Sequence, residues 1–424
     1  MPRMCPMRGD QKQNRITSSK GFRVPSQVKF TAFLMLLVLP VTAAGILTFI
    51  GMVQNGVGNV DGIQDVVAIS VSPDGQNLYA VGRLDHAVAV FSRDIESGAL
   101  SFQETHFDGV AGVLGLFEPS DIAVSPDGRN VYVVSDVDDS VVIFARNLAT
   151  GSLQYVRHYQ DGVDGIHGIN GANSVAVSPD GTLVLVTGRT EDTLATFSRD
   201  IPLDDLVLVD VDQDGVEEVD DMAAPSGVAI SPDGQNVYVT AELDDSVVVF
   251  TRDPTQDAVH YRESVWTPEG PSSVVVNGGG DAVYVTGAWW FRVHSRNLVN
   301  GSLLPTWFFA DGVHGVGGLD GARDVIAAPT DAPVFVAGAF DDAVAVFDRE
   351  WPSGELAYLE AIYDGVDGVE GIGGAHGLAL SPDGRFLYVA GANDNAISIF
   401  VVTQVLFTGG FDFGDTSRWS ATVP

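Results

Sequence analysis

Short apolar runs of four to six residues, rich in β-branched side chains, recur along nearly the whole chain. Each run is bounded by proline, glycine or aspartate, which are typical of turns. The segment from Ser226 to Asp253 shows the pattern most clearly, with three runs separated by a Ser-Pro-Asp-Gly turn at 231–234 and an acidic turn at 242–246. No long segment has the 3.6-residue period of a helix. The pattern therefore predicts strand, turn, strand, turn, strand.

The Ser-Pro-Asp-Gly turn recurs at a regular interval. Its intact copies begin at Ser72, Ser125, Ser178, Ser231 and Ser381, and the first four are 53 residues apart. Degenerate copies at 277–281 and 328–331 bring the total to seven units. Units of roughly fifty residues are typical of β-propeller blades with four strands each. The fourth strands are expected to begin near Leu47, Leu100, Leu153, Leu206, His260, Leu303 and Leu356.

These units predict an all-β fold, a seven-bladed β-propeller over residues 45–402 with four antiparallel strands per blade. The last unit has three strands of its own, and no repeat-type strand follows it. The segment from Leu47 to Val53 aligns without gaps with the fourth strands of other units. We therefore expect this N-terminal strand to join the last blade, because closing the ring removes open sheet edges.

The first 44 residues differ from the repeats. They contain all three lysines and one acid, and an apolar run from Phe30 to Ala44 ends in small residues. This is the pattern of a signal peptide, so we expect secretion or a periplasmic location in a bacterium, with no membrane span after cleavage. The only cysteine, Cys5, lies in this segment. Residues 403–424 form a C-terminal tail to which the sequence assigns no role.

The formal net charge is −34, and no lysine occurs beyond residue 44. A surface this acidic repels phosphate backbones, which excludes nucleic acid as a partner. We expect a monomer whose partner is a protein or a carbohydrate that the sequence does not identify.

Acids are placed regularly in the turns. An acid or amide followed by glycine comes after each fourth strand, and further acids occupy the second turn of most units. One face of the ring should thus be negative and could bind cations, although both positions are also ordinary places for turn-forming aspartate.

One of these turns matches a calcium-binding loop, with oxygen-bearing residues at the required spacing and glycine at the sixth position. The candidate ligands are Asp210, Asp212, Asp214, Val216, Glu218 and Asp221. The alternative is an acid-rich copy of the ordinary turn. Calcium is the one cofactor that the sequence suggests.

The fifth unit is unusual because its second turn is shortened and aromatic. It reads Ala-Trp-Trp-Phe-Arg, and the next strand adds three more aromatic residues at 307–309. Exposed aromatic rings would bind a sugar or a protein partner, whereas buried ones would pack in the core. The candidate binding residues are Trp289, Trp290, Phe291 and Arg292.

The unit from Ser231 to Phe250 resembles the seven-bladed lactonase-like propellers and the related YVTN-repeat surface propellers, whose signature is partly present at 238–240 and 284–286. The resemblance covers Leu47 to about Val402 and implies the propeller fold. Enzymes among these propellers carry a glutamate after the second strand of one blade, and Glu242 matches that position. His376 resembles the histidine of a motif that begins a blade in these enzymes.

The resemblance breaks at the other positions of that site. The family's Pro-Arg-His is Pro225-Ser226-Gly227 here, and its His-Ser-Val is Asn173-Ser174-Val175. On this basis no arginine or histidine is expected beside Glu242. The main expectation is therefore a binding or surface-interaction module, and the alternative is a lactone hydrolase similar to 6-phosphogluconolactonases that uses Glu242.

Overall fold

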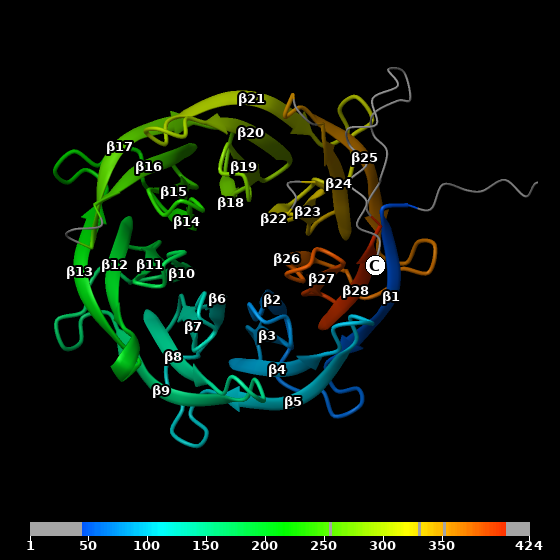
Figure 1. The fold of residues 1–424 in the computed structure, drawn as a ribbon, viewed down its shortest axis with the longest axis horizontal. Coiled ribbons are helices and arrows are strands. Elements are labelled where there is room, and N and C mark those ends of the chain that lie inside the picture. Colours follow the sequence, from blue (N-terminus) through cyan, green and yellow to red (C-terminus); the bar gives the residue numbers. More distant parts are fainter. Residues whose placement is uncertain (1–44, 254–256, 330–331, 351–352, 404–424) are drawn as a thin grey trace, which may run out of the picture. The chain divides into compact units, whose positions relative to one another are not determined.

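The computed structural model describes residues 45–253, 257–329, 332–350 and 353–403. The predicted signal peptide lies outside these ranges, as does the predicted tail except for its first residue. Within them, seven four-stranded antiparallel sheets are arranged as the blades of a ring (Figure 1). The predicted seven-bladed, all-β propeller is confirmed.

Each of the first six blades is built from four consecutive strands, running from the ring centre outward. Blade 1 contains β2 (Val66–Val71), β3 (Asn77–Gly82), β4 (Ala87–Arg93) and β5 (Leu100–Phe107). Blade 2 contains β6 (Pro119–Val124), β7 (Asn130–Ser135), β8 (Ser140–Arg146) and β9 (Leu153–Gln160). Blade 3 contains β10 (Ala172–Val177), β11 (Leu183–Gly188), β12 (Thr193–Asp200), the short 3-10 helix η1 (Ile201–Leu203) and β13 (Asp205–Gln213).

The remaining blades follow the same order, except that the last takes its outer strand from the start of the chain. Blade 4 contains β14 (Pro225–Ile230), β15 (Asn236–Ala241), β16 (Ser246–Asp253) and β17 (Ala258–Trp266). Blade 5 contains β18 (Pro271–Val276), β19 (Ala282–Gly287), β20 (Trp290–Arg296) and β21 (Leu303–Ala310). Blade 6 contains β22 (Ala322–Ala327), β23 (Val334–Gly338), β24 (Ala343–Arg349) and β25 (Leu356–Tyr363). Blade 7 contains β26 (Ala375–Leu380), β27 (Phe386–Gly391), β28 (Ala396–Val402) and β1 (Leu47–Gln54).

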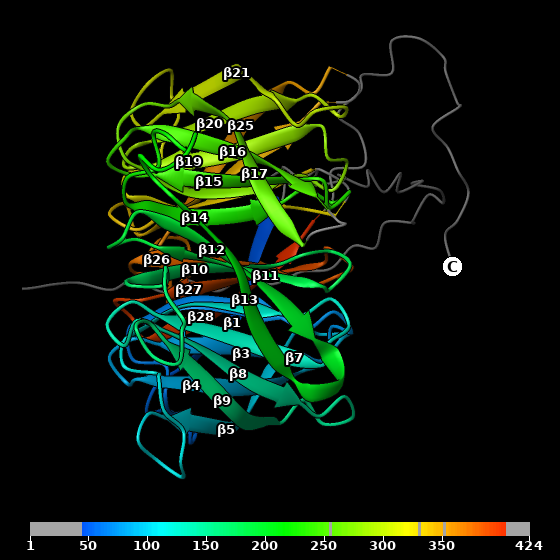
Figure 2. The same cartoon turned by 90° about the vertical axis from the view of Figure 1, so that its left-hand side faces the viewer.

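The hydrophobic core lies between neighbouring blades. The second strand of every blade is buried along its whole length, because a blade packs against each of its two faces. These strands are accordingly rich in valine, tyrosine and other apolar residues on both faces. The outer strands mix buried and exposed positions, as expected at the rim of the ring. Figure 2 shows the blades from the side, with their connecting loops at the two faces of the ring.

The predicted ring closure is also confirmed. Strand β1 pairs antiparallel with β28, from Leu47 opposite Val402 to Gln54 opposite Ala396. One further backbone hydrogen bond extends the pairing, from the Thr403 N–H to the Ile46 carbonyl at 2.8 Å. The two ends of the propeller are therefore joined within one blade.

In five pairs of neighbouring blades, a buried arginine binds an aspartate across the interface, at the face that carries the Ser-Pro-Asp-Gly turns. In blade 2, Arg146 Nη2 lies 2.7 Å from Asp74 Oδ2 of blade 1, and its Nε donates to the Tyr79 hydroxyl at 2.6 Å. We call this arrangement the arginine clamp. The same pairing recurs at Arg199 with Asp127, Arg252 with Asp180, Arg296 with Asp233, and Arg349 with Asp281.

The clamp changes at the two interfaces of blade 7. Arg93 of blade 1 donates to the Tyr388 hydroxyl and lies over the Phe386 ring at 5.1 Å. Blade 7 itself has Val402 at the position that carries the arginine in the other blades. The interface between blades 6 and 7 therefore lacks this ion pair within the described residues.

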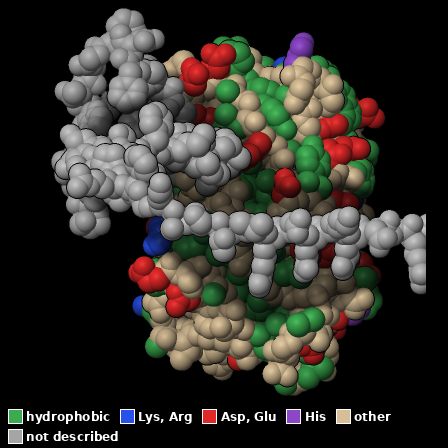
Figure 3. Space-filling view, turned by 90° about the vertical axis from the view of Figure 1, so that its right-hand side faces the viewer, with side chains coloured by type: hydrophobic (Ala, Val, Ile, Leu, Met, Phe, Trp, Pro, Cys, Tyr) green, Lys and Arg blue, Asp and Glu red, His purple; other side chains and the backbone are tan. Residues whose placement is uncertain are grey.

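The side of the ring in Figure 3 shows acidic side chains scattered among hydrophobic and neutral ones, with basic side chains visible at few places. Among the residues that the structure describes, no helix is long and apolar enough to cross a membrane.

Candidate functional site

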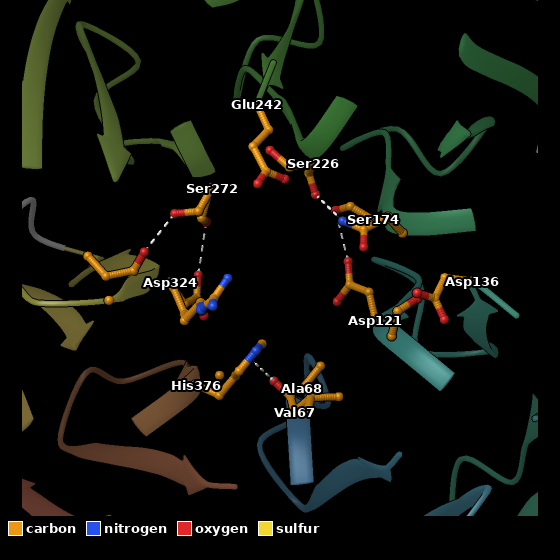
Figure 4. A pocket seen from close by; sticks show the side chains of 18 of the residues that line it. Val67, Ala68, Asp121, Asp136, Ser174, Ser226, Glu242, Ser272, Asp324 and His376 are labelled. Atoms are coloured by element: carbon orange, nitrogen blue, oxygen red, sulfur yellow. Dashed lines mark hydrogen bonds between the residues drawn. The ribbon is translucent and has the colours of Figure 1, made fainter. Parts of the chain in front are cut away.

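A cavity of about 450 Å³ occupies the centre of the ring. It opens at the face where the inner strands begin and the second strands end, opposite the face that carries the arginine clamps. Seven inner strands line it, so every blade contributes side chains at equivalent positions (Figure 4). The second residues of the inner strands form its wall: Val67, Ser120, Asn173, Ser226, Ser272, Arg323 and His376.

Three serines of this wall are held by the neighbouring blade. The hydroxyls of Ser120, Ser226 and Ser272 donate to carbonyls at the start of the next inner strand, at 2.8, 2.9 and 2.7 Å. Since each hydroxyl proton is used in this way, the serine oxygens keep lone pairs that can accept hydrogen bonds from a ligand. The wall is thus fixed in place and presents acceptors to the cavity.

His376 performs the same linking role between the last blade and the first. Its Nδ1 lies 2.8 Å from the Val67 carbonyl oxygen and therefore carries the proton, which leaves Nε2 as an acceptor. Burial, together with the nearby Arg323 charge, lowers the pKa of His376 to about 4. The imidazole of His376 is therefore neutral at pH 7. The structure thus brings His376 to the same cavity as Glu242, as a neutral group that helps close the ring.

Two aspartates lie on opposite sides of the cavity (Figure 4). Asp121 accepts hydrogen bonds from Ser174 Oγ and from the Val175 N–H, both at 2.9 Å. Asp324 accepts from the Leu378 N–H at 2.8 Å. Burial raises the pKa of each carboxyl to about 6, although these hydrogen bonds oppose the shift. Both carboxylates therefore fasten adjacent blades and face a low-dielectric environment.

The rim of the cavity carries charges of alternating sign. The residue that follows the second strand is Arg83 in blade 1, Asp136 in blade 2, Arg189 in blade 3 and Glu242 in blade 4. We call these four residues the charged arc. In blades 5 to 7 the equivalent residues are Ala288, Ala339 and Ala392.

Within the arc, Arg189 Nη2 donates to Glu242 Oε2 and forms an ion pair across the boundary between blades 3 and 4. The expectation that no arginine stands beside Glu242 was therefore wrong. It followed from the residues at the start of blade 4, whereas this arginine comes from the end of a strand in the preceding blade. The 53-residue spacing from Glu242 back to Arg189 is the sequence signal that could have identified it.

The acids after the fourth strands serve as turn residues. Asp108 Oδ1 accepts from the backbone N–H eight residues later at 3.1 Å, and Asp161 and Asp364 do the same at the same distance. Acids of the second turns also accept from backbone N–H groups, as Asp244 does from Ala223 at 2.7 Å. These carboxylates satisfy the backbone of their own loops, which favours the turn interpretation over a cation-binding mouth.

The candidate calcium ligands are not gathered around one point. Asp210 and Asp212 belong to the extended strand β13, and Asp214 Oδ1 accepts from the Met222 N–H at 2.8 Å. The side chains of Val216 and Glu218 are exposed, and Asp221 Oδ2 accepts from the Ser264 hydroxyl. Within the described residues, no group of three or more His, Cys, Asp or Glu side chains could hold a metal ion. The segment is an acid-rich strand and turn.

The aromatic residues of blade 5 separate into core and surface. Trp290 and Phe291 are fully buried, so these two candidate binding residues belong to the core, and this part of the prediction is corrected. Only four residues connect β17 of blade 4 to β18 of blade 5, and Trp290 packs against this short connection, with its Nε1 donating to the Glu269 carbonyl at 2.8 Å. Trp289 is exposed, and Arg292 lies over the Trp266 ring at 5.8 Å.

Comparison with known proteins identifies a family. The model of the family described as "Lactonase, 7-bladed beta-propeller" matches residues 37–164, 121–212 and 201–289, which together cover more than half of the chain. A 6-phosphogluconolactonase of Klebsiella pneumoniae is 22% identical over 222 residues, which are 51% of this chain and 62% of that protein. The chain thus spans less than two thirds of this relative's length.

Solved structures show the same fold at low identity. A periplasmic gluconolactonase of Pseudomonas aeruginosa has a TM-score of 0.60 at 21% identity, over 79% of this chain and 91% of that one. Hydrazine synthase of Kuenenia stuttgartiensis has a TM-score of 0.60 at 18% identity, over 84% of this chain and 100% of that one. Proteins with this fold therefore catalyse unrelated reactions, so the function of this chain has to be argued from its site. The family match favours the alternative of a lactonase over the expected binding module.

Proposed function

Because this chain belongs to the seven-bladed β-propeller lactonase family, we propose that it hydrolyses sugar lactones in its central cavity. The observation that carries the proposal is the Arg189–Glu242 ion pair at the rim of this cavity. Hydrolysis of a lactone needs a cationic or dipolar group for the oxyanion and a base for the attacking water. The ion pair supplies the first of these.

The cavity suits a small, hydroxylated ligand. Its volume of about 450 Å³ lies within the range of roughly 300 to 1,000 Å³ that is usual for small-molecule sites. The fixed oxygens of Ser120, Ser226 and Ser272 would accept hydrogen bonds from sugar hydroxyls, and His376 Nε2 offers one more acceptor. The relatives named above act on gluconolactone or its 6-phosphate according to their names, and this supports a sugar lactone as substrate.

In this proposal Arg189 holds the lactone carbonyl oxygen. Its guanidinium is always charged and presents planar N–H donors, which stabilise the negative charge that develops on that oxygen. Glu242 holds the guanidinium over the cavity and offsets its charge before substrate binds. Glu242 thus acts through Arg189.

The Glu242→Gln variant tests this role. We expect kcat/KM for gluconolactone to fall by at most about 100-fold, because Arg189 keeps its charge but loses the carboxylate that holds it at the carbonyl oxygen. The melting temperature should barely change, because both side chains of the pair are more than 40% exposed and such pairs contribute about 0 to 1 kcal/mol. The matched control is Glu96→Gln, at a side chain that is 89% exposed, which should keep full activity.

The assay follows acid release above the uncatalysed rate for gluconolactone and its 6-phosphate. Failure of the wild-type protein to accelerate ring opening of either lactone would overturn the proposed function.

A further inference from the structure

Asp136 is the one member of the charged arc without a paired charge. Arg83 Nε lies 2.8 Å from Asp65 Oδ2, and Arg189 is paired with Glu242. Asp136 forms no ion pair with any residue that the structure describes, and its Oδ1 is buried without a hydrogen-bond partner. A buried carboxylate oxygen of this kind is costly unless something donates to it.

The position of Asp136 determines what can approach its carboxylate. The side chain follows β7 at the rim and lines the central cavity, between the blades that carry Arg83 and Arg189. Glu242 at the equivalent place two blades later already accepts from Arg189. Because Asp136 lines the cavity, a molecule there can approach its other oxygen, Oδ2, which is not buried, and a water beside the substrate fits that place.

The charges around Asp136 suit proton transfer. Burial is the main cause that raises the pKa of Asp136, and the Glu118 carboxylate raises it further. The Arg83 and Arg189 charges oppose this rise. A raised pKa makes a carboxylate a stronger base, and the two arginines favour its ionised form.

We propose that Asp136 is the general base of the lactone hydrolysis, an inference that rests on the proposed function. Asp136 removes a proton from water, and the water oxygen forms a bond to the lactone carbonyl carbon while the carbonyl electron pair moves to oxygen beside Arg189. The intermediate then collapses and breaks the bond between the carbonyl carbon and the ring oxygen. The ring oxygen takes the proton back from Asp136, so one lactone and one water give one hydroxy acid.

Glu242 and Asp136 occupy equivalent places in the repeat but have different roles in the proposed reaction. Glu242 accepts a charge-assisted hydrogen bond from Arg189, which engages its carboxylate and makes it a positioning group. Asp136 forms no ion pair with the described residues and takes the proton on Oδ2. The two residues should therefore respond differently to removal of their charge.

The test is the Asp136→Asn variant, assayed on gluconolactone and its 6-phosphate. We expect kcat to fall by about 100- to 10,000-fold, the usual contribution of a general base, with KM changed less than threefold. The acid limb of the kcat/KM profile should disappear in this variant. Asp121 and Asp324 also titrate near pH 6, so the variant and not the wild-type profile assigns the limb.

The matched control is Asp164→Asn, which removes the same charge from an exposed loop position and should keep wild-type rates. Retention of kcat and of the acid limb in Asp136→Asn, with an active wild type, would overturn the inference and leave the proposed function standing. An inactive wild type would remove both. A variant with an unchanged melting temperature but reduced kcat supports the catalytic role over a structural one.

Discussion

The environment of each aspartate in this ring decides the direction of its pKa shift. Asp74 in an arginine clamp is partly buried, which alone would raise its pKa, but hydrogen bonds from Ser72 and Arg146 lower the pKa below its usual value. Asp121 in the cavity wall has no arginine partner, and burial raises its pKa to about 6. One residue type is thus used as a permanent anion at one face and as a titratable group at the other.

The clamp arginine is the residue whose loss should affect stability most directly. Arg146 has a buried side chain that binds Asp74 and Tyr79 and also donates to the Gly128 carbonyl at 3.2 Å. Replacing it by methionine leaves these partners without their donor. We expect Arg146→Met to lower the free energy of unfolding by about 3 kcal/mol, measured by urea denaturation.

The control for this experiment is Arg129→Ala. The Arg129 side chain is 59% exposed and lies 3.9 Å from Asp127, so its removal should change the free energy of unfolding by less than about 0.5 kcal/mol. Equal effects of the two variants would show that burial of the clamp arginine contributes nothing to the free energy of unfolding.

Among the strands, β1 is the one on which closure of the ring depends. Strand β1 supplies the outer edge of blade 7, and the Ile46 N–H donates to Glu360 Oε1 of blade 6 at 2.8 Å. Without β1, the apolar edge of β28 would be open to solvent and to other chains.

Deleting residues 1–53 should therefore impair folding. We expect this shortened chain to lose the cooperative melting transition of a chain that begins at Gly45, or to melt at a clearly lower temperature, as followed by circular dichroism. The chain that begins at Gly45 is the matched control because it keeps β1. Superimposable melting curves for the two chains would contradict the role of β1 in closure.

The elements were predictable because their signals are local. Strand lengths and turn residues can be read within a single unit, and the repeat interval follows from comparing one unit with the next. Strand β1 was found because it matches the fourth strands of other units. The arc was not predicted, because its pairing joins side chains 53 residues apart and no local pattern indicates that Arg189 reaches Glu242. Asp136 is unpaired because Arg83 and Arg189 of the neighbouring blades bind other carboxylates, which the sequence does not show. Burial of Trp290 was also missed, since it depends on the short connection from β17 of blade 4 to β18 of blade 5.

At the scale of the whole molecule, stability should depend on pH in two opposite ways. Asp121 and Asp324, with pKa values of about 6, and Asp212, with a pKa raised by burial and by Asp210 and Glu217 to about 7, bind protons more tightly when folded. Their protonation stabilises the fold as pH falls from about 7 to about 4. The clamp aspartates have lowered pKa values, so their contribution is present above the usual value of 3.8 and is lost below it.

Burial lowers the pKa of His376 to about 4 and the pKa of His294 to about 3, so these two imidazoles destabilise the fold as pH falls below their usual value of 6.5 and oppose the buried aspartates. We therefore expect the melting temperature to rise from pH 8 to about pH 6.5, to change less between pH 6.5 and about pH 4, and to fall below about pH 4. Asp212→Asn should raise the melting temperature at pH 8 and flatten the upper part of this curve, because the Asp212 Oδ2 atom is buried without a partner. Asp164→Asn, at an exposed position, should leave the shape of the curve unchanged. A melting temperature that is constant between pH 8 and pH 6.5 would contradict the contribution of Asp212.

The number of blades has a consequence for the charged arc. A closed ring with an odd number of members cannot alternate two signs all the way round, because at least one pair of like charges must meet. This ring of seven alternates over four blades and is neutral over three, at Ala288, Ala339 and Ala392, so no like charges are neighbours in it. The charged arc therefore occupies one part of the rim, and the opening of the cavity is asymmetric. In the proposed function, a lactone that enters the cavity meets the Arg189–Glu242 pair on one side of it.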